Sequence, residues 1–190
     1  MQMKTADAIV KAIMIADQPE SFVTRRLEEI ELEFGGMRGD RHFGITAKSD
    51  VRQPMYKKGT EILNRRQLTM VSEEQLAIIA EELGVEKVLP EWLGANMLLS
   101  GFEELTTLPI GSRILFPDGT GLICMGENKP CIHPGQMIQV NYPSLPKLDT
   151  RFVKAGYKRR GIVCAVERPG MIRVNEEVRI LINDVDNPMQ

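Results

Sequence analysis

The segment 125–138, MGENKPCIHPGQMI, brings a thiol and an imidazole together on a proline-rich stretch. Cys131 lies between two prolines, with Lys129 two residues before it and His133 two residues after it. A nearby ammonium or imidazolium group stabilises a thiolate, which is the form of cysteine that attacks, carries sulfur or binds metal. The prolines predict a stiff turn, hostile to a helix, that holds the sulfur in one direction. We therefore interpret Cys131 as a candidate reactive thiol, with an unreactive loop cysteine as the alternative.

The other cysteines have a different context. Cys124 in GLICMG and Cys164 in GIVCAV lie inside apolar stretches typical of strands, where cysteine commonly serves only for packing. The total of three cysteines is odd and without repeating spacing, so we expect no disulfide framework and a reducing, cytoplasmic location. Zinc is not expected either, because there is no Cys-x-x-Cys and the spacing from Cys124 to Cys131 and His133 matches no common structural zinc pattern.

Hydrolase and nucleotide-binding motifs are missing from the sequence. There is no Gly-x-Ser-x-Gly elbow, no phosphate-binding Walker loop and no dinucleotide fingerprint. A Cys–His pair for nucleophilic hydrolysis would need His42 or His133, since these are the chain's two histidines. His133 is too near Cys131 in the sequence for the usual arrangement, so the sequence gives a hydrolase little support.

Two further segments are candidate sites. In GDRHFG, 39–44, two glycines flank an acid, a base and an imidazole, and such a turn can point backbone N–H groups and Arg41 at an anion. The alternative is that Asp40 pairs with Arg41 while His42 caps a loop. In LGANMLLSG, Asn96 stands just before an apolar strand, where it can contact a ligand or only satisfy turn backbone.

Composition limits the classes of function. The chain has 190 residues, 43% hydrophobic and 26% charged, which is ordinary for a globular domain. Its net charge of −2 argues against nucleic-acid binding by bulk electrostatics. The basic clusters at 25–26, 65–66 and 158–160 are interpreted as solvated surface rather than anion sites. The N-terminus lacks the pattern of a signal peptide and no stretch is long enough to span a membrane, so we expect no membrane partner.

Short apolar stretches separated by glycine predict several strands. The stretch 8–16 suits a buried strand, and residues 30–34 alternate in the manner of a half-buried strand that ends at a Gly-Gly turn. The Asp-Gly pair of FPDGTG, 116–121, predicts a hairpin turn, and 161–182 predicts two strands joined by a Pro-Gly turn. The stretch 35–60 has no period, and such a long stretch in a compact domain is more often functional than idle.

One helix is strongly indicated. Ser72 with Gln75 forms a capping box, an apolar face follows, and Gly84 ends the helix. A second helix is possible over part of 148–157, because the prolines before it confine any helix to that part. Together these patterns predict a β-rich α+β domain, most simply a barrel that closes its own edges, with one or two flanking helices and no internal linker.

The order of these motifs resembles that of the MOSC domain family, named for the C-terminal domain of molybdenum cofactor sulfurase. The matching stretches are GDRHFG, NRRQLTMVSEEQL, LGANMLLSGFEELTTLPIGSRI, KPC and RRGIVCAVERPGMIRVNEEVRI, in that order. The resemblance runs from about Gly39 to Ile182 and is strongest to small, stand-alone bacterial members. It implies a single MOSC-type β-barrel domain over 1–190 with its core at about 39–182.

The resemblance identifies Cys131 as the family's cysteine. It implies that this thiol carries sulfur, received from a PLP-dependent cysteine desulfurase and passed to a molybdenum cofactor or metal–sulfur centre of an acceptor protein. PLP is implied only through that partner. Other relatives bind molybdenum cofactor (molybdopterin) themselves, use the cysteine as the molybdenum ligand and reduce N-hydroxylated compounds. The candidate cofactor-binding residues are Asp40, Arg41, His42, Arg66, Asn96, Lys129 and His133.

The chain departs from the family pattern at two places near these residues. Many members have an arginine near the Pro-Cys pair, where this chain has Asn128 and Lys129, and Asn96 is kept while an acid before it is lost. Three hypotheses therefore stay open: a sulfurtransferase-type carrier, a molybdenum enzyme, and a non-catalytic binding module in which Cys131 is incidental. The first two need the same residue with the same properties, so the sequence does not separate them.

Overall fold

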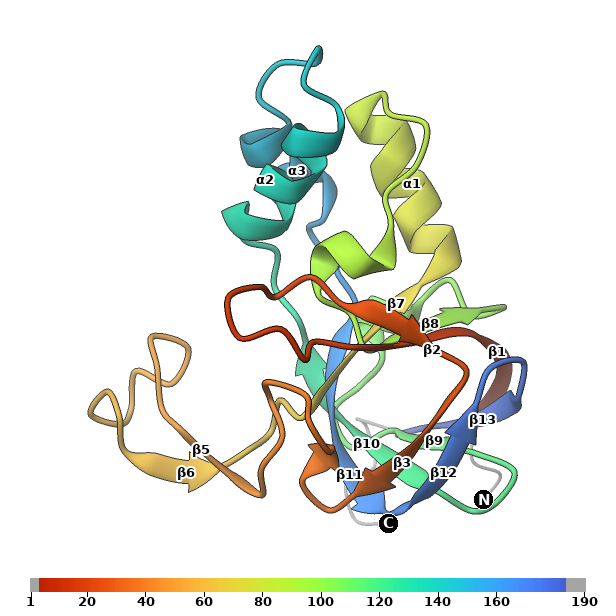
Figure 1. Cartoon of the computed structure of the whole chain (residues 1–190). Coiled ribbons are helices and arrows are strands. Elements are labelled where there is room, and N and C mark those ends of the chain that lie inside the picture. Colours follow the sequence, from red (N-terminus) through yellow and green to blue (C-terminus); the bar gives the residue numbers. More distant parts are fainter. Residues whose placement is uncertain (1–3, 184–190) are drawn as a thin grey trace.

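The computed structural model describes residues 4–183, and its main sheet is a closed barrel of seven strands (Figure 1). The barrel closes because β13 pairs with both β9 and β1, and it is mixed because β7 and β8 run parallel. Closure removes the unpaired strand edges and confirms the predicted β-rich barrel. Around the barrel the strands are β13 (Glu177–Ile182), β9 (Arg113–Leu115), β10 (Gly121–Glu127), β11 (Ile162–Arg168), β7 (Leu68–Ser72), β8 (Met97–Ser100) and β1 (Lys4–Ile15).

Shorter strands extend the barrel. β2 (Arg25–Leu27) continues the sheet beyond β1, and β12 (Gly170–Arg173), β3 (Glu29–Glu33) and β4 (Gly36–Met37) form a second sheet in that order. The irregular stretch 35–60 contributes β5 (Thr46–Lys48), which pairs with β6 (Glu61–Leu63). This hairpin and its connecting loop project from the side of the barrel as an arm, which we call the β5–β6 arm (Figure 1).

The prediction of two strands over 161–182 was wrong in number, because the segment forms three strands: β11, β12 and β13. The strand before the Pro-Gly pair, β11, pairs with β10 and β7, whereas β12 after it pairs with β3 in the second sheet. The chain therefore crosses between sheets at Pro169, and the crossing is held by Asp118, whose Oδ2 accepts a hydrogen bond from Met171 N at 2.9 Å. The hairpin predicted around Asp118 does form, with Gly121 opposite Leu115.

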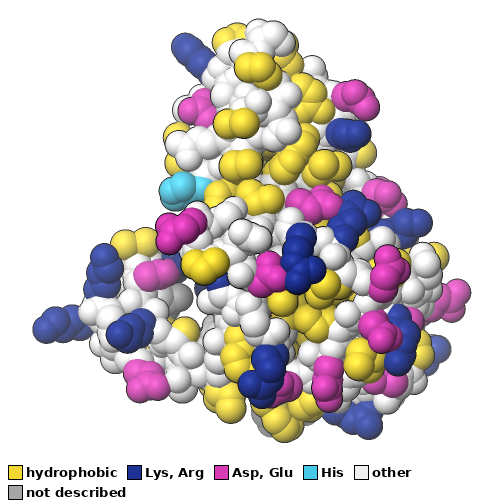
Figure 2. Space-filling view, in the orientation of Figure 1, with side chains coloured by type: hydrophobic (Ala, Val, Ile, Leu, Met, Phe, Trp, Pro, Cys, Tyr) yellow, Lys and Arg dark blue, Asp and Glu magenta, His cyan; other side chains and the backbone are white. Residues whose placement is uncertain are grey.

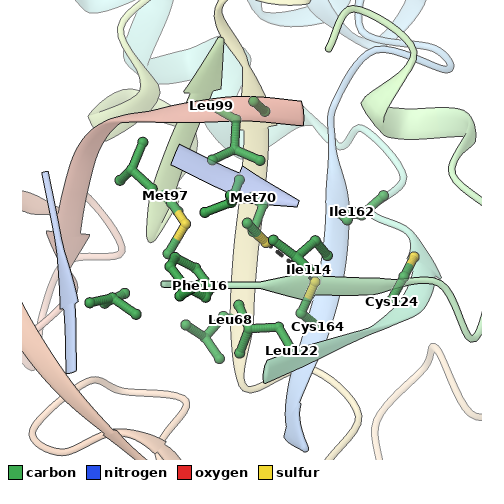
Figure 3. Close-up of a cluster of buried hydrophobic side chains, with 14 of the residues drawn as sticks. Leu68, Met70, Met97, Leu99, Ile114, Phe116, Leu122, Cys124, Ile162 and Cys164 are labelled. Atoms are coloured by element: carbon green, nitrogen blue, oxygen red, sulfur yellow. Dashed lines mark hydrogen bonds between the residues drawn. The ribbon is translucent and has the colours of Figure 1, made fainter. Parts of the chain in front are cut away.

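The inside of the barrel is an apolar core to which strands distant in sequence contribute (Figure 3). Cys124 and Cys164 lie opposite each other on β10 and β11, and each is 0% exposed. Burial raises the pKa of both thiols above the ordinary value. The packing role predicted for these two cysteines is therefore confirmed.

Three α-helices gather at one end of the barrel (Figure 1). They are α1 (Glu73–Leu83), α2 (Ile132–Asn141) and α3 (Leu148–Ala155), with short 3₁₀ turns η1 (Pro90–Leu93) and η2 (Leu105–Thr107) nearby. Their apolar faces meet in a second core with side chains of β1, β7 and β8. Within residues 4–183 no helix has the length and apolar character needed to cross a membrane.

Helix α1 begins and ends as predicted. Ser72 is its N-cap, with Oγ accepting from Gln75 N at 3.4 Å, and Gly84 ends it in the left-handed conformation with φ 70°. The reciprocal half of the capping box does not form, because Gln75 Oε1 instead accepts from Thr106 Oγ1 at 2.6 Å. The side chain predicted to cap α1 thus ties it to the η2 turn.

Helix α2 corrects the prediction that the segment around Cys131 is hostile to a helix, and it raises the helix number above the expected one or two. Pro134 is the third residue of α2, and proline is tolerated there because the first-turn N–H groups have no intrahelical acceptor. Gly135 lets α2 approach α3 closely, since an added Cβ would collide with the backbone carbonyl of Asp149.

Candidate functional site

Cys131 is the N-cap residue of α2 and is exposed, whereas the other two thiols are buried. Its side chain makes no capping hydrogen bond, and its Sγ lies 3.8 Å from Nδ1 of His133, which is also exposed. The N-terminus of a helix carries partial positive charge and unpaired N–H groups, which favour an anion next to it. The sulfur therefore lies at an accessible and electropositive point of the fold.

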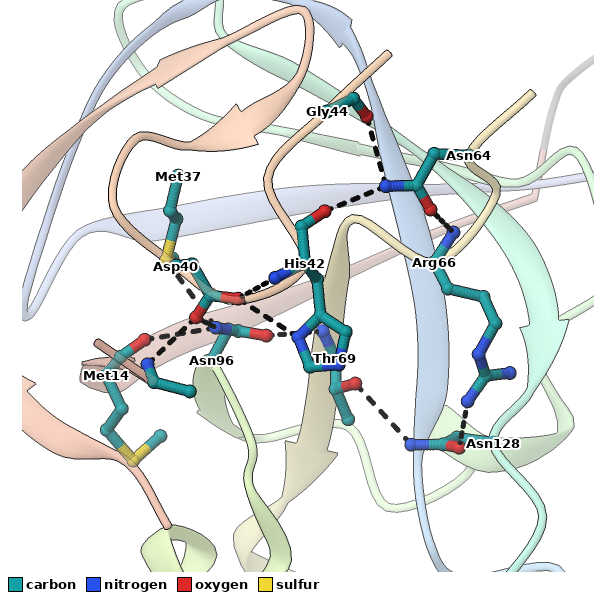
Figure 4. Close-up of polar contacts among 11 residues, drawn as sticks. Met14, Met37, Asp40, His42, Gly44, Asn64, Arg66, Thr69, Asn96 and Asn128 are labelled. Carbon is teal, nitrogen blue, oxygen red and sulfur yellow. Dashed lines mark hydrogen bonds and ion pairs between the residues drawn. The ribbon is translucent and has the colours of Figure 1, made fainter. Parts of the chain in front are cut away.

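Arg66 belongs to the same region through Asn128. Its Nη2 donates to Asn128 Oδ1 at 2.8 Å, and Asn128 Nδ2 lies 3.5 Å from Thr69 Oγ1 of β7 (Figure 4). Burial and the charge of Arg52 lower the pKa of Arg66, while Asp50 and a negative charge on Cys131 favour its charged form. Asn128, which stands where many family members have arginine, thus holds an arginine that comes from another part of the chain.

Arg160 also reaches this region and was missed from the sequence. The cluster 158–160 was interpreted as solvated surface, yet Arg160 is only 7% exposed and its Nη2 donates to Leu93 O at 2.5 Å. Its Nη1 is buried without a hydrogen-bond partner among the described residues. Burial lowers the pKa of Arg160 to about 10, with Cys131 and Arg66 as the neighbouring charges that act on it. This correction adds a buried, unpaired cation to the candidate site.

Asp40 and Asn96 form a buried network behind the exposed site (Figure 4). Asp40 Oδ2 accepts from Ala16 N and from Asn96 Nδ2, both at 2.8 Å, and Oδ1 accepts from His42 N at 2.8 Å and faces His42 Nδ1 at 3.0 Å. Burial alone would raise the pKa of the Asp40 carboxyl. The hydrogen bonds outweigh burial and hold that pKa below its ordinary value.

Asn96 joins three parts of the chain within this network. Its Oδ1 accepts from Thr69 N at 2.9 Å, and its Nδ2 also approaches Met14 O at 3.3 Å. Asn96 is 1% exposed, and both ends of its amide are used by protein atoms. The observed contacts of Asn96 are thus structural. They agree with the alternative that this side chain satisfies backbone groups, and they include partners outside its own turn.

The backbone cradle predicted at GDRHFG does not form. Its amide groups donate to the protein itself: Arg41 N to Ala16 O at 2.9 Å, Phe43 N to Asp40 O at 3.0 Å, and Gly44 N to Gly35 O at 2.9 Å. Asp40 pairs with His42 and not, as the alternative had it, with Arg41. The turn is therefore folded inward, because the buried carboxylate needs donors of its own.

A basic cavity of about 370 Å³ lies between the GDRHFG turn and the β5–β6 arm. Its lining includes one acid, Asp50, which is paired with Arg52 at 2.6 Å. Figure 2 shows several Lys and Arg side chains on the arm, with acidic side chains among them. The cationic residues that line the cavity are Arg41, Lys48, Arg52, Arg65 and Arg66.

The predicted residues therefore divide into three groups, with Lys129 apart from them. Cys131, His133 and Arg66 lie in the region of the α2 N-terminus, whereas Asp40 and Asn96 are internal supports. Arg41 and His42 line the cavity, and Lys129 is exposed next to Pro130. The only sequence signal for Arg160 was its place in RRG, immediately before an apolar strand, and that signal does not distinguish it from Arg159.

Comparisons with known proteins agree with this geometry. The model of the MOSC domain family matches residues 38–179. The chain is 49% identical over 177 residues to YuaD of Bacillus subtilis, across 93% of this chain and 92% of YuaD. The name of YuaD assigns it provisionally to metal-sulfur cluster biosynthesis.

Solved structures give the same result. The crystal structure of YuaD from Bacillus subtilis superposes with a TM-score of 0.93 at 47% identity, over 96% of this chain and all of that chain. YiiM from Geobacillus stearothermophilus superposes with a TM-score of 0.63 at 13% identity, over 94% of this chain and 77% of YiiM. The second likeness concerns the fold alone.

Proposed function

Because the chain belongs to the MOSC domain family, we propose that it acts in metal–sulfur chemistry as a sulfur carrier. In this proposal Cys131 accepts sulfur from a PLP-dependent cysteine desulfurase and passes it to a metal–sulfur centre or molybdenum cofactor of an acceptor protein. The name of the relative YuaD, which refers to metal-sulfur cluster biosynthesis, supports the broader role. PLP belongs to the donor enzyme and not to this chain.

The observation that carries the proposal is the contrast among the three thiols. Cys131 is exposed at the positive end of α2, while Cys124 and Cys164 are fully buried with raised pKa values. A sulfur carrier needs a thiol that two protein partners can reach in turn, which only an exposed sulfur allows. The Arg66 and Arg160 guanidiniums add positive charge near that sulfur.

The transfer is a thiol–disulfide type exchange. The Cys131 thiolate attacks the outer sulfur of the donor's cysteine persulfide, a new S–S bond forms at Cys131, and the donor's S–S bond breaks with its electron pair left on the donor thiolate. In the second step a thiolate of the acceptor protein attacks the outer sulfur, a new S–S bond forms on the acceptor, and Cys131 leaves as the thiolate. Neither step requires an added oxidant or reductant.

Mass spectrometry tests this proposal. The full chain is incubated with a cysteine desulfurase and cysteine, and the peptide that contains Cys131 is expected to gain the mass of one sulfur atom. Cys131→Ser should abolish the gain, and Cys124→Ala, a matched change at a buried thiol, should leave it intact. Sulfur that fails to appear on Cys131 in the wild type, or that persists in Cys131→Ser, would contradict the carrier role.

The alternative is that this chain binds molybdenum cofactor. The basic cavity is the observation that supports this alternative. The cationic lining of this cavity, which includes Arg66, suits an anionic group of a pterin cofactor. The described residues contain no group of three or more His, Cys, Asp or Glu side chains that could hold a metal ion, so the pterin would have to bring the metal. Cys131 would then be the thiolate ligand, and the bound cofactor would supply a redox-active metal for reducing N-hydroxylated compounds.

Purification from a host that makes molybdenum cofactor separates the two proposals. Metal analysis is expected to find stoichiometric molybdenum, lost in Cys131→Ser, only if the alternative is correct. Molybdenum absent from the wild type, together with sulfur on Cys131 after desulfurase treatment, would favour the carrier. If neither occurs, a non-catalytic binding module becomes the better description.

A further inference from the structure

The segment 45–66, which contains the β5–β6 arm, combines positive charge with exposed apolar side chains (Figure 2). It holds six of the chain's 24 Lys and Arg residues but two of its 26 Asp and Glu residues. The exposed fractions of Val51, Met55 and Tyr56 are 85%, 73% and 50%. Lys57 and Lys58 follow directly, are exposed and form no ion pair within residues 4–183. Apolar side chains gathered on an exposed surface are typical of contact with another molecule.

The loop that carries these side chains is held in one shape by Ser49. This residue is 2% exposed, and its Oγ donates to Lys57 O at 2.8 Å and accepts from Thr60 N at 3.1 Å. Its backbone N–H also donates to Thr60 O at 2.8 Å. A loop that is already ordered loses little conformational entropy when it binds a partner. The arm is therefore a preformed surface.

A second basic segment surrounds α3. Residues 147–160 hold six Lys and Arg residues and one acid. Two of these cations, Lys154 and Lys158, line a groove of about 690 Å³ together with Val153 and Tyr157. Tyr157 is 62% exposed and Val153 is 39% exposed. This segment therefore has the same character as the arm, with cations next to accessible apolar side chains.

Hydrogen bonding joins the arm to the loop that ends at Cys131. Arg66 at the base of the arm lines the basic cavity together with Arg52 of the arm loop. The Nη2 of Arg66 donates to Asn128 Oδ1 at 2.8 Å. Asn128 precedes Cys131 by three residues, so the chain limits their separation to about 11 Å.

The end of α3 meets the same loop. Lys158 N donates to Glu127 Oε1 at 3.3 Å, and a Cβ added at Gly156 would lie 3.2 Å from Cβ of Pro130. Pro130 is the residue before Cys131. A protein that binds another protein covers about 800 Å² of it, a patch roughly 30 Å across. A protein placed over the Cys131 sulfur therefore meets both basic segments.

We propose, on the basis of the carrier role proposed above for Cys131, that these two segments form the docking surface for the protein that delivers sulfur to it, and that this protein contacts them with an acidic face. Opposite charges speed the encounter and set its orientation, while the exposed apolar side chains add area to bury. The apolar side chains favour a protein over a nucleic acid, because Val51 and Met55 have nothing to pack against on a phosphate backbone. The chain's net charge of −2 also disfavours a polyanion.

Charge reversal tests the docking surface. The second-order rate constant for sulfur loading of Cys131 is measured with a cysteine desulfurase and cysteine at about 50 mM salt, where surface charges are weakly screened. Lys57→Glu, Lys58→Glu and Lys154→Glu should each lower this rate constant by about 3- to 10-fold, because a reversed charge slows association. Lys4→Glu is the matched control: Lys4 is exposed on β1, opposite Ile182 of β13, and its variant should stay within about twofold of wild type.

Iodoacetamide distinguishes docking from reactivity of the thiol. This reagent is small and uncharged, so it needs no docking surface. Its rate of alkylation of Cys131 should stay within about twofold of wild type in all four variants and at about 500 mM salt, where loading by the desulfurase should slow. Alkylation that falls in parallel with loading would mean that the lysines act on the sulfur or on the fold, and would overturn the inference.

Failure of this inference is separable from failure of the carrier role. If the desulfurase loads wild type and the Lys57, Lys58 and Lys154 variants at equal rates, the docking surface is overturned and the carrier role stands. If it does not load wild type, both fail. An RNA or DNA oligonucleotide that binds wild type but not the lysine variants, with loading unchanged, would assign the surface to nucleic acid and also overturn the inference.

Discussion

Two polar regions of this molecule lie close together and are satisfied very differently. In the Asp40 network, both carboxylate oxygens and both ends of the Asn96 amide have protein partners (Figure 4). Around Cys131, the thiol makes no capping bond, and Nη1 of Arg160 has no hydrogen-bond partner within residues 4–183. A network that is fully satisfied holds its parts in one arrangement, whereas an exposed thiol without a capping bond stays free to react.

The contacts of the two regions have different roles. The Asp40 network ties β1, β7 and β8 to the GDRHFG turn, which lines the basic cavity. The α2 N-terminus instead keeps an accessible sulfur beside two cations. Changes in the first region should therefore affect stability, and changes in the second should affect chemistry more than stability.

The largest difference is expected in thiol reactivity. In the folded protein, iodoacetamide should label Cys131 at least about 100-fold faster than Cys124 and Cys164, because buried thiols react only after local opening. Peptide mass spectrometry at successive times measures the three rates. In urea the three rates should converge, which provides the control, and equal rates in the folded protein would contradict the assignment of Cys131 as the accessible thiol.

The next largest effect is expected at Asn96. Asn96→Ala should lower the free energy of unfolding by about 3 kcal/mol, because it removes a partner from Asp40 and leaves Thr69 N unsatisfied. Urea denaturation followed by circular dichroism measures this. The matched control is Asn141→Ala on the exposed face of α2, expected within about 0.5 kcal/mol of wild type. Similar losses in both variants would contradict the special role of the network.

A smaller effect on the free energy of unfolding is expected at acidic pH. The pKa of Asp40 is lower in the folded protein than in the unfolded chain, so its ionised form stabilises the fold above the ordinary Asp pKa of about 3.9. That contribution is lost as the pH falls through the lower, folded value. Wild type should therefore lose stability with acid more steeply than Asp40→Asn. The carboxyls of Glu74 and Asp118, which also have lowered pKa values, are common to both proteins and cancel in the comparison.

The smallest change in stability is expected at Arg160. Arg160→Met should alter the free energy of unfolding by no more than about 1 kcal/mol, because an unpaired buried cation is replaced by an apolar side chain of similar length. Urea denaturation beside Arg159→Met measures the difference. A loss as large as that of Asn96→Ala would mean that Arg160 is a structural residue and would remove the contrast between the two regions.

Several features could be predicted from short stretches of the sequence. The capping serine, the apolar face and the terminal glycine located α1, and strand periodicity with the Asp-Gly turn located the β9–β10 hairpin. The environment of the three cysteines was also predicted correctly from the apolar stretches around Cys124 and Cys164 and the prolines around Cys131. Each of these signals lies within a few residues, where helix and strand geometry act directly.

Other features could not be predicted from short stretches of the sequence. Prolines argued against a helix at Cys131, but α2 forms because Pro134 falls in its first turn and α3 covers one side of it. The Pro-Gly pair predicted a turn between two strands, but pairing to β3 makes a separate strand, β12, in another sheet. In both cases a local preference was overridden by packing against a segment distant in the sequence.

By itself, the sequence determined the type of fold, the strong helix and which of the three thiols differs in its surroundings. Only the tertiary structure decided which polar groups have partners. Arg66 meets Asn128 across 62 residues and Arg160 meets Leu93 across 67, while the adjacent Arg159 turns to Glu82. The physical reason is that hydrogen-bond satisfaction is a property of the assembled interior, so one arginine of a pair becomes solvated and its neighbour is buried with an idle donor.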